Sequence, residues 1–488
     1  MSGGTARTAG AGADAGAGAG ADAGTDAGTE QPPSGLDGPL VRAALVLALG
    51  AFVALLDTTV VGVALHGFGL RFGAGPAAVQ WVVTAYLLAM SAVIPATGWA
   101  AGRFGAAACW TGSLAVFLAG SALCGAAWSL GSLVAFRALQ GLGAGMLFPL
   151  MRILVVQAAG PQRMGRTMSL IAVPILVAPV AGPVLGGAVL HSLSWRWVFL
   201  LNVPVCLLAV VLSPLLLPNV RGPRPERLDA VGLVTVGAGL AAGMLGFGRL
   251  GTDGPVTGAV LPLLAAAALL AWHGVRARRR PDGAVIDFTL FRDRSFTAST
   301  AVGLLNSLGL YGAVVLVPLF FQQAGGYDPL AAGTIMVAQG AGAGVAVLLV
   351  GRVIDARSNP RALVLTGLAL VAAALTAFAT AGRAEPGPLL LGALFVQGVG
   401  LALAAAPVMV TLYHSLPPTA VAAATTANAV SQQLGAAVGT TVVALLVQHA
   451  AAGAAGAGAF RGAFWGALGF VALTAVPAAF LPAGRKEE

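Results

Sequence analysis

Long apolar runs follow one another along most of this 488-residue chain, separated by charged residues or by Pro and Gly. A run of about 20 apolar residues can cross the hydrocarbon core of a bilayer as a helix. The pattern therefore predicts fourteen membrane-spanning helices. They cover residues 43–65, 77–101, 106–128, 131–156, 166–190, 197–217, 229–249, 257–274, 297–321, 330–350, 361–381, 388–411, 421–448 and 462–482.

Composition agrees with a lipid environment, because 58% of the residues are hydrophobic and only 9% are charged. No soluble fold of this length buries so much apolar surface. The sequence thus predicts an integral, all-α membrane protein.

The distribution of basic residues predicts its orientation. With an even number of spans both termini lie on one side, and twenty of the 26 Lys and Arg residues fall in segments on that side, against five on the other and Arg137 within a span. Basic residues accumulate in cytoplasmic loops, so both termini are predicted to be cytoplasmic. The same rule accounts for the basic net charge, and no nucleic-acid motif accompanies it.

A weak internal repeat predicts two halves. GWAAGRFG from Gly98 follows the second span, and GRVIDARS from Gly351 follows the tenth. We expect six-helix bundles at 39–217 and 297–482, two inserted helices at 218–274 and a cytoplasmic loop at 275–296. The Ala/Gly-rich residues 1–38 lack the features of a signal peptide and are predicted to be a disordered cytoplasmic tail, with a second tail at 483–488.

Asp57 is the only acidic residue well inside a predicted span, and Arg137 is the comparable basic one. A charge at the centre of a membrane helix costs at least about 2.5 kcal/mol, so such residues usually face a protein interior or a watery cavity. Counting residues from the predicted span ends places the two at similar depth. Two interpretations stay open: a proton-coupling pair, or a structural Asp57 hydrogen-bonded to Thr58, Thr59 or another helix.

The fifth predicted span, VPILVAPVAGPVLGGAVL, combines prolines with closely spaced glycines. Proline removes a helix hydrogen bond and bends the axis, and Gly182-xxx-Gly186 permits close approach of a neighbouring helix. A transporter with moving halves and ordinary membrane packing both account for this composition.

Four segments resemble motifs of the major facilitator superfamily, and within it the fourteen-span drug:proton antiporter family. They are LDTTVVGVAL from Leu56, RALQGLGAG from Arg137, AGPVLGG from Ala181 and SWRWVFLLNVPV from Ser194, which occur in the family's order over about residues 43–482. The resemblance implies a major facilitator fold and a proton-coupling role for Asp57 and Arg137. It also implies an antiporter motif that includes Pro174, Gly182, Pro183, Gly186 and Gly187.

The gating loops depart from the family pattern in the first half. Gly102, Ala106 and Ala107 stand where an aspartate and basic residues are usual, whereas the second half keeps charged residues. Gating is therefore expected to depend more on the second half. The gating residues assigned by the resemblance are Gly98, Arg103, Gly351, Arg352, Asp355 and Arg361.

Embedded polar and aromatic side chains are candidates for the substrate cavity, although helix–helix hydrogen bonding would use amides equally well. These candidates are Asn306, Tyr311, Gln339, Gln397, Asn428, Gln432 and Gln433. An apolar cavity with amide groups suits an amphiphilic organic molecule. No cluster of acidic residues or cysteines indicates a metal site, and none of the motifs indicates a cofactor.

The sequence and the resemblance together predict a monomeric transporter of the cytoplasmic membrane that exports hydrophobic or amphiphilic drugs or antibiotics in exchange for protons. The proton gradient would be its energy source. Alternatives within transport are a dedicated exporter of one metabolite and an importer. A transport-dead membrane sensor is a further alternative, whereas an intramembrane enzyme would need an acidic cluster that the sequence lacks.

Overall fold

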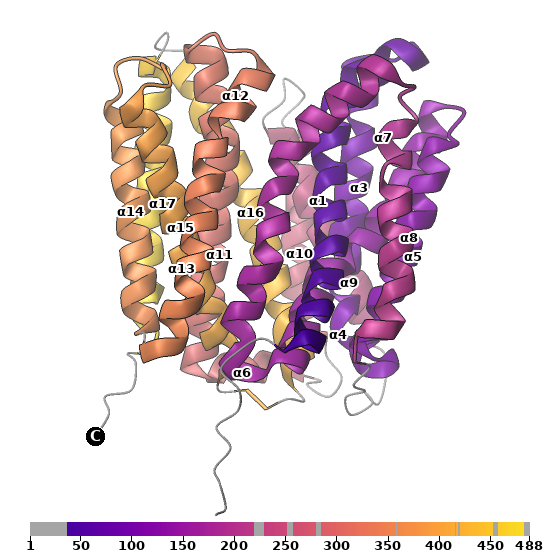
Figure 1. Cartoon of the computed structure of the whole chain (residues 1–488), viewed down its shortest axis with the longest axis vertical. Helices are drawn as coiled ribbons and strands as arrows, with labels where there is room; N and C mark the ends of the chain where they lie inside the picture. The colour runs from indigo at the N-terminus through magenta and orange to yellow at the C-terminus, as the bar shows by residue number, and fades with distance from the viewer. Residues whose placement is uncertain are drawn as a thin grey trace, which may run out of the picture. The chain divides into compact units, whose positions relative to one another are not determined.

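The structure is a computed structural model that describes residues 37–218, 229–250, 257–279, 285–357, 359–414, 416–417, 420–451 and 457–482. The predicted tails lie outside this part of the chain, except for the last two residues of the first. Throughout the described residues the secondary structure is helical, without a strand, as the apolar pattern predicts. Figure 1 shows the helices running side by side along one common direction.

The helices of the first half begin at Gly38. They are α1 (Gly38–Phe72), α2 (Pro76–Val79), α3 (Trp81–Val93), α4 (Ala96–Phe104), α5 (Ala106–Gly125), α6 (Leu130–Ser192), α7 (Trp197–Leu200) and α8 (Asn202–Leu216). Two further helices, α9 (Ala230–Leu250) and α10 (Thr257–Arg279), follow them.

The second half begins with the short 3-10 helix η1 (Phe288–Arg292). It continues with α11 (Arg294–Leu319), the π-helical turn η2 (Phe320–Ala324), α12 (Pro329–Ile335), α13 (Val337–Arg357), α14 (Pro360–Thr380), α15 (Pro388–His414), α16 (Val421–Ala451) and α17 (Ala457–Ala478). Asp293, Asp328 and Asn359 cap the helices that follow them by accepting a backbone N–H, which satisfies one of the free donors of a helix start.

Each of the fourteen predicted spans falls on helix. Two of them, 131–156 and 166–190, lie on the 63-residue α6, which is interrupted at Gly160 by a backbone φ of 64°. Only glycine adopts this left-handed conformation without strain. Gly160 therefore marks the connection between two spans that are otherwise continuous helix.

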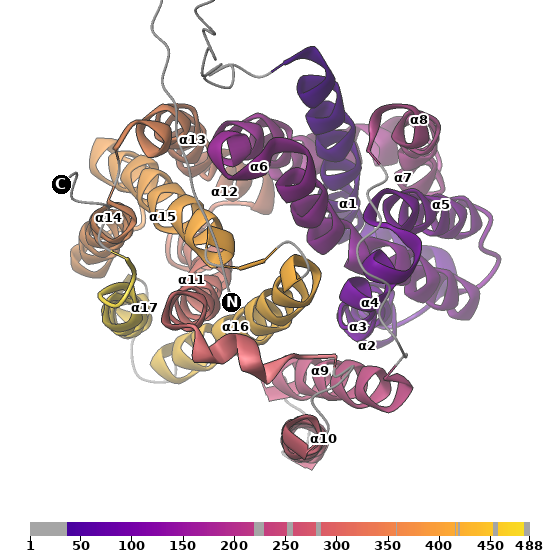
Figure 2. The same ribbon diagram turned by 90° about the horizontal axis from the view of Figure 1, so that it is seen from below.

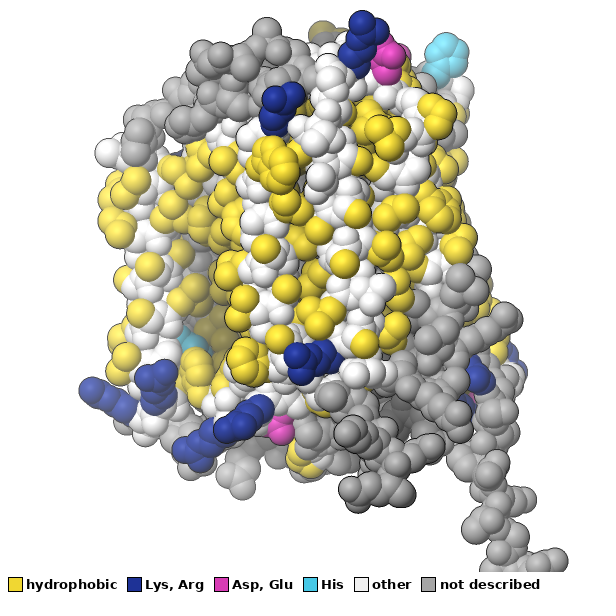
Figure 3. All heavy atoms as spheres, turned by 90° about the vertical axis from the view of Figure 1, so that its left-hand side faces the viewer, with side chains coloured by type: hydrophobic (Ala, Val, Ile, Leu, Met, Phe, Trp, Pro, Cys, Tyr) yellow, Lys and Arg dark blue, Asp and Glu magenta, His cyan; other side chains and the backbone are white. Residues whose placement is uncertain are grey.

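Ten helices in the described residues are long and apolar enough to cross a membrane, and the pair α3 and α4, bent by 58°, makes eleven if it counts as one span. The other predicted spans are the second part of α6, α11 and α12 with α13. The fourteen-span count is compatible with this structure. Figure 3 shows a broad band of apolar side chains between two ends at which arginines gather, as expected for a protein surrounded by lipid.

The hydrophobic cores of the two halves meet at one end of the molecule. Leu412 and Tyr413 of α15 belong to the same buried cluster as Leu154 and Val155 of α6. At this end, the lower one in Figure 1, α6 reverses its direction, and its helical backbone is interrupted at Gly160. By contrast, two other clusters of the described residues each stay within one half. The cluster around Phe68 and Phe199 belongs to the first half, and the cluster around Phe320 and Phe378 belongs to the second. The halves are thus packed together at the end predicted to be cytoplasmic.

Helix α9 lies at the junction of the two halves, against α3 and α16, with α10 on its outer side (Figure 2). The Gln433 Nε2 of α16 donates to the Ser91 Oγ of α3 at 2.8 Å, and that hydroxyl lies 3.1 Å from the Met244 Sδ of α9. Helix α9 therefore contacts both halves. The domain boundaries given above stay a prediction.

At one end of α9 and α10, Arg276 Nη1 donates to both oxygens of Asp229, at 2.7 and 2.8 Å. The Gly232 N–H also donates to the Asp229 Oδ1, at 2.9 Å. The Asp229 carboxylate thus joins the two helices.

Candidate functional site

Asp57 and Arg137 form an ion pair inside the first half. The Arg137 Nη1 lies 2.5 Å from the Asp57 Oδ2, and the side chains are 1% and 0% exposed. Asp57 belongs to α1 and Arg137 to α6, so the pair joins two helices that are far apart in sequence. Both charges are removed from solvent and lipid.

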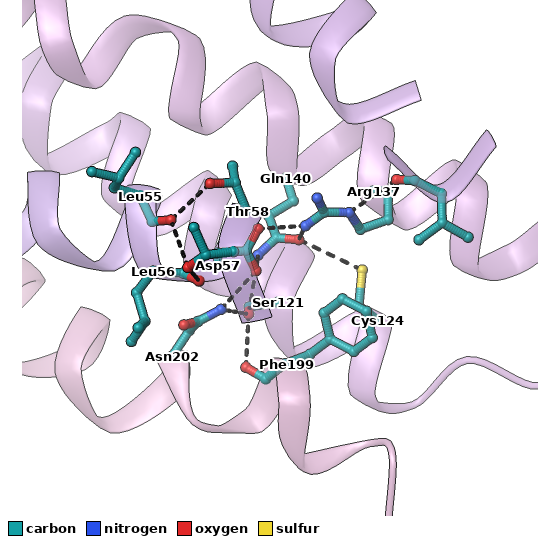
Figure 4. A network of polar contacts seen from close by, with 12 residues as sticks. Leu55, Leu56, Asp57, Thr58, Ser121, Cys124, Arg137, Gln140, Phe199 and Asn202 are labelled. Atoms are coloured by element: carbon teal, nitrogen blue, oxygen red, sulfur yellow. Dashed lines mark hydrogen bonds and ion pairs between the residues drawn. The ribbon is translucent and has the colours of Figure 1, made fainter. Parts of the chain in front are cut away.

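Three further polar side chains complete the Asp57 network (Figure 4), which we define as Asp57, Arg137, Gln140, Asn202 and Ser121. Gln140 Nε2 and Asn202 Nδ2 donate to the Asp57 Oδ1 at 3.0 and 2.8 Å. The Ser121 hydroxyl accepts from the same two amides, at 3.2 Å each. Helices α1, α5, α6 and α8 thus each contribute to one buried network.

Two further hydrogen bonds and a ring contact hold the Arg137 guanidinium. Its Nε donates to the Val82 carbonyl at 3.1 Å, and its Nη1 donates to the Gln140 Oε1 at 2.7 Å. The guanidinium carbon lies 4.1 Å from the centre of the Tyr86 ring, a cation–π contact that favours a buried cation. A buried ion pair is tolerated only when its other hydrogen-bonding groups are satisfied in this way.

The Asp57 carboxylate accepts hydrogen bonds from three side chains, Arg137, Gln140 and Asn202. Thr58 and Thr59 donate instead to backbone carbonyls of Leu55 and Leu56. The two threonines therefore bond within α1 and leave the Asp57 carboxylate to the side chains of other helices.

The local sequence explains why Arg137 and Gln140 meet the same partner. A reciprocal hydrogen-bond cap between Ser129 and Ser132 starts α6, and residues three apart then lie on the same face of the helix. The sequence pattern did not single out Gln140, Asn202, Ser121 or Tyr86 as site residues. One signal for them was present, since Gln140 and Asn202 stand within two of the four family-like segments, as amides in otherwise apolar helices.

The antiporter-motif residues bring α6 against α1. Gly182 is buried so closely against Thr59 that a Cβ at Gly182 would lie only 2.6 Å from the Thr59 Cβ, and a Cβ at Gly186 would lie 3.3 Å from Val60 Cγ1. Gly187 is exposed, with open space at its Cβ position. Pro174 is half-buried on the same helix, and the side chain of Pro183 lies outside the described part. The predicted close approach thus has α1 as its partner.

Replacing Gly182 by Val is expected to lower the stability of the folded protein by about 1–3 kcal/mol or more, because the added methyl groups overlap Thr59 of the helix that carries Asp57. Gly187→Val is the matched control, since it adds the same atoms five residues later into open space. Thermal unfolding of the two purified variants measures the difference. Equal stability of the two would contradict the tight α1–α6 contact.

The gating residues have different surroundings in the two halves. Gly98 of α4 packs against α16, where a Cβ would lie 2.7 Å from the Thr426 Oγ1 and 3.0 Å from the Ala422 carbonyl. Arg103 and Arg361 are exposed. In the described residues, α4 and α16 thus meet through a small residue rather than an ion pair. The side-chain positions of Gly351, Arg352 and Asp355 lie outside the described part, so their gating role stays a prediction.

The predicted cavity residues do not line one cavity. Asn306 and Gln397 border a cavity of about 20 Å³ within the second half, which holds a water molecule but no drug. Asn428 and Gln432 face Gly303 of α11. Gln432 also accepts from Arg152 Nη2 at 3.0 Å, across the contact of the two halves.

Two of the remaining candidates also lie elsewhere. Gln433 contacts α3 and α9, and Gln339 is buried on α13, while the side chain of Tyr311 lies outside the described part. Several of these amides thus serve helix packing. The sequence does not separate them from cavity residues, because an embedded amide looks the same in either role. Gln397 and Asn428 are buried without a hydrogen-bond partner among the described residues.

One protein family matches this chain over most of its length. The profile of the Major Facilitator Superfamily matches residues 47–277 and 299–488. The chain belongs to the major facilitator superfamily. It is therefore a multi-pass membrane protein of a transporter superfamily, with a major facilitator fold.

Relatives of this major facilitator protein carry names of multidrug resistance and multidrug export proteins. It is 36% identical over 421 residues to the "Multidrug resistance protein B homolog" of Mycobacterium tuberculosis, covering 86% of this chain and 78% of the relative. It is 30% identical over 415 residues to the "Multidrug export protein EmrB" of Escherichia coli K12, covering 83% and 79%.

Solved structures confirm the fold of this major facilitator protein. The proton:xylose symporter XylE bound to 6-bromo-6-deoxy-D-glucose superposes with a TM-score of 0.62 at 16% identity, covering 90% of this chain and 94% of the symporter. A double Trp mutant of XylE gives a TM-score of 0.67, also at 16% identity, with 92% and 97% covered. At this identity the likeness concerns the fold alone.

Proposed function

We propose that this chain is a proton-coupled antiporter that exports hydrophobic or amphiphilic compounds, including drugs or antibiotics, across the cytoplasmic membrane. The names of the relatives support export of such compounds. The observation that carries the coupling is the Asp57 network, in which a fully buried carboxylate is paired with a fully buried guanidinium on another helix. Both charges are costly at this depth and suit a group that binds and releases a proton.

The coupling step follows from the hydrogen bonds of the network. A proton bound by Asp57 neutralises the carboxylate and removes the charge that holds the Arg137 Nη1 at 2.5 Å. Arg137 keeps its contacts to Tyr86 and to the Val82 carbonyl, so it stays bound to α3 while α1 is released. Loss of the proton on the other side restores the pair. Because α1 also packs on Gly182 and Gly186, α1 would transmit the change to the antiporter motif.

The described conformation is proposed to be the outward-facing one. The buried contact between the halves lies at the end where basic residues accumulate, which the positive-inside rule assigns to the cytoplasm together with both termini. In this state a proton would reach Asp57 from outside while the compound leaves. The six-helix bundles at 39–217 and 297–482 would then rock about the contact between the two halves. Helix α9, which packs on both halves, lies beside this contact.

Transport in everted membrane vesicles tests the proposal. An acidic lumen should drive accumulation of a fluorescent amphiphilic compound, and nigericin, which collapses the pH gradient, should abolish it. A panel of amphiphilic compounds and single metabolites distinguishes broad from dedicated export. Accumulation that does not depend on the gradient, or transport only in the opposite direction, would contradict proton-coupled export.

A further inference from the structure

An apolar groove with a volume of about 690 Å³ lies between α1, α6 and α8. Its walls include Leu45, Leu49, Phe52, Val177 and Leu212, and one charged residue, Arg42, lines it. Leu45 and Val177 are 49% and 51% exposed, so the groove opens at the surface of the helices. The volume lies within the range of about 300–1,000 Å³ typical of sites for small organic molecules.

The groove spans the depth of one leaflet. Arg42 stands near the start of α1, and Phe52 lies ten residues further along the helix, a rise of about 15 Å. Half of a hydrocarbon core of about 30 Å has the same length. On α8 the groove is bordered by Leu212 and Leu216, at the end of that helix. The groove therefore extends from the membrane interface to about the midplane, the length of an extended acyl chain.

One positive charge, that of Arg42, lies at the interfacial end of the groove. Arg42 Nε donates to the Gly38 carbonyl at 3.3 Å, which holds the guanidinium along the first turn of α1. The N-cap residue of α1, Asp37, makes no side-chain capping bond and pairs with Arg163 at 3.2 Å. Arg42 has no ion-pair partner among the described residues. The Arg42 guanidinium is therefore the charge that the groove offers to an anionic headgroup at the membrane interface.

We propose that this groove is a binding site for one phospholipid with an anionic headgroup. Its phosphate contacts Arg42, and one acyl chain lies against Leu45, Leu49 and Val177. The guanidinium disfavours a cationic amphiphile at the same place, whereas anionic lipids of the cytoplasmic leaflet are attracted to such charges. The site is separate from the Asp57 network and does not depend on the proposed transport cycle.

Native mass spectrometry of the purified full chain tests the site, with dioleoyl phosphatidylglycerol and dioleoyl phosphatidylcholine as probes. The unaltered protein should retain one phosphatidylglycerol more tightly than phosphatidylcholine. Arg42→Gln removes the headgroup contact and should lower that retention at least severalfold, down to the level of phosphatidylcholine. Val177→Trp fills the groove and should lower the retention of both lipids.

Two matched variants control for general effects. Arg461→Gln removes an exposed arginine on α17, and Val234→Trp adds an indole at a 69% exposed position on α9. Both should retain the lipid as the unaltered protein does, and size-exclusion profiles verify that all four variants are folded. Unchanged retention in Arg42→Gln or in Val177→Trp overturns the proposal, as does an equal loss in the controls.

Discussion

Replacing Asp57 by Asn is expected to abolish proton-driven export while the protein stays inserted and folded. Asn has the same shape, and its amide oxygen still accepts from Gln140 or Asn202, but it does not bind and release a proton at physiological pH. The pH-gradient-driven accumulation of a fluorescent compound in everted vesicles should fall to the level of vesicles without the protein. Binding of the compound to the purified variant should persist.

Asp328→Asn is the matched control for this experiment. Asp328 is exposed and caps α12, and Asn caps a helix about as well as Asp. This variant should transport at the rate of the unaltered protein. If Asp57→Asn still accumulates the compound against a gradient that nigericin collapses, Asp57 is not the coupling residue.

The second large effect is expected from Arg137→Leu. This change leaves the Asp57 carboxylate buried without its counterion, and breaking a buried pair in this way costs about 3–5 kcal/mol. Thermal unfolding in detergent should show a large loss of stability and a lower yield of folded protein. Asp57→Leu alone should also be destabilising, because it leaves the guanidinium unpaired.

The double variant Asp57→Leu, Arg137→Leu separates charge from packing. It removes both charges, so it should be more stable than Arg137→Leu alone, although it should not couple transport to protons. A double variant whose stability loss equals the sum of the two single losses would show that the ion pair contributes nothing. Retained gradient-dependent transport would contradict the mechanism independently of stability.

The sequence alone determined the environment and the arrangement along the chain. Apolar runs of span length have few structural solutions in lipid, because every backbone group must be satisfied within a helix. A charged side chain is costly inside such a run, so the aspartate Asp57 and the arginine Arg137 are conspicuous from the residue pattern alone. The Gly182-xxx-Gly186 spacing likewise indicated a tight helix contact, although it did not indicate the partner helix.

Tertiary structure decided which side chains meet. Gln140 and Asn202 look in sequence like Gln397 or Gln433, yet only the packing of α1, α5, α6 and α8 brings the first two onto Asp57. The predicted substrate residues were separated for the same reason, because an amide in an apolar helix reveals its depth but not the direction in which it faces. Contacts between segments far apart in the chain also decide which helix packs on Gly182, and they form the groove beside Arg42. Such contacts leave no local pattern in the sequence.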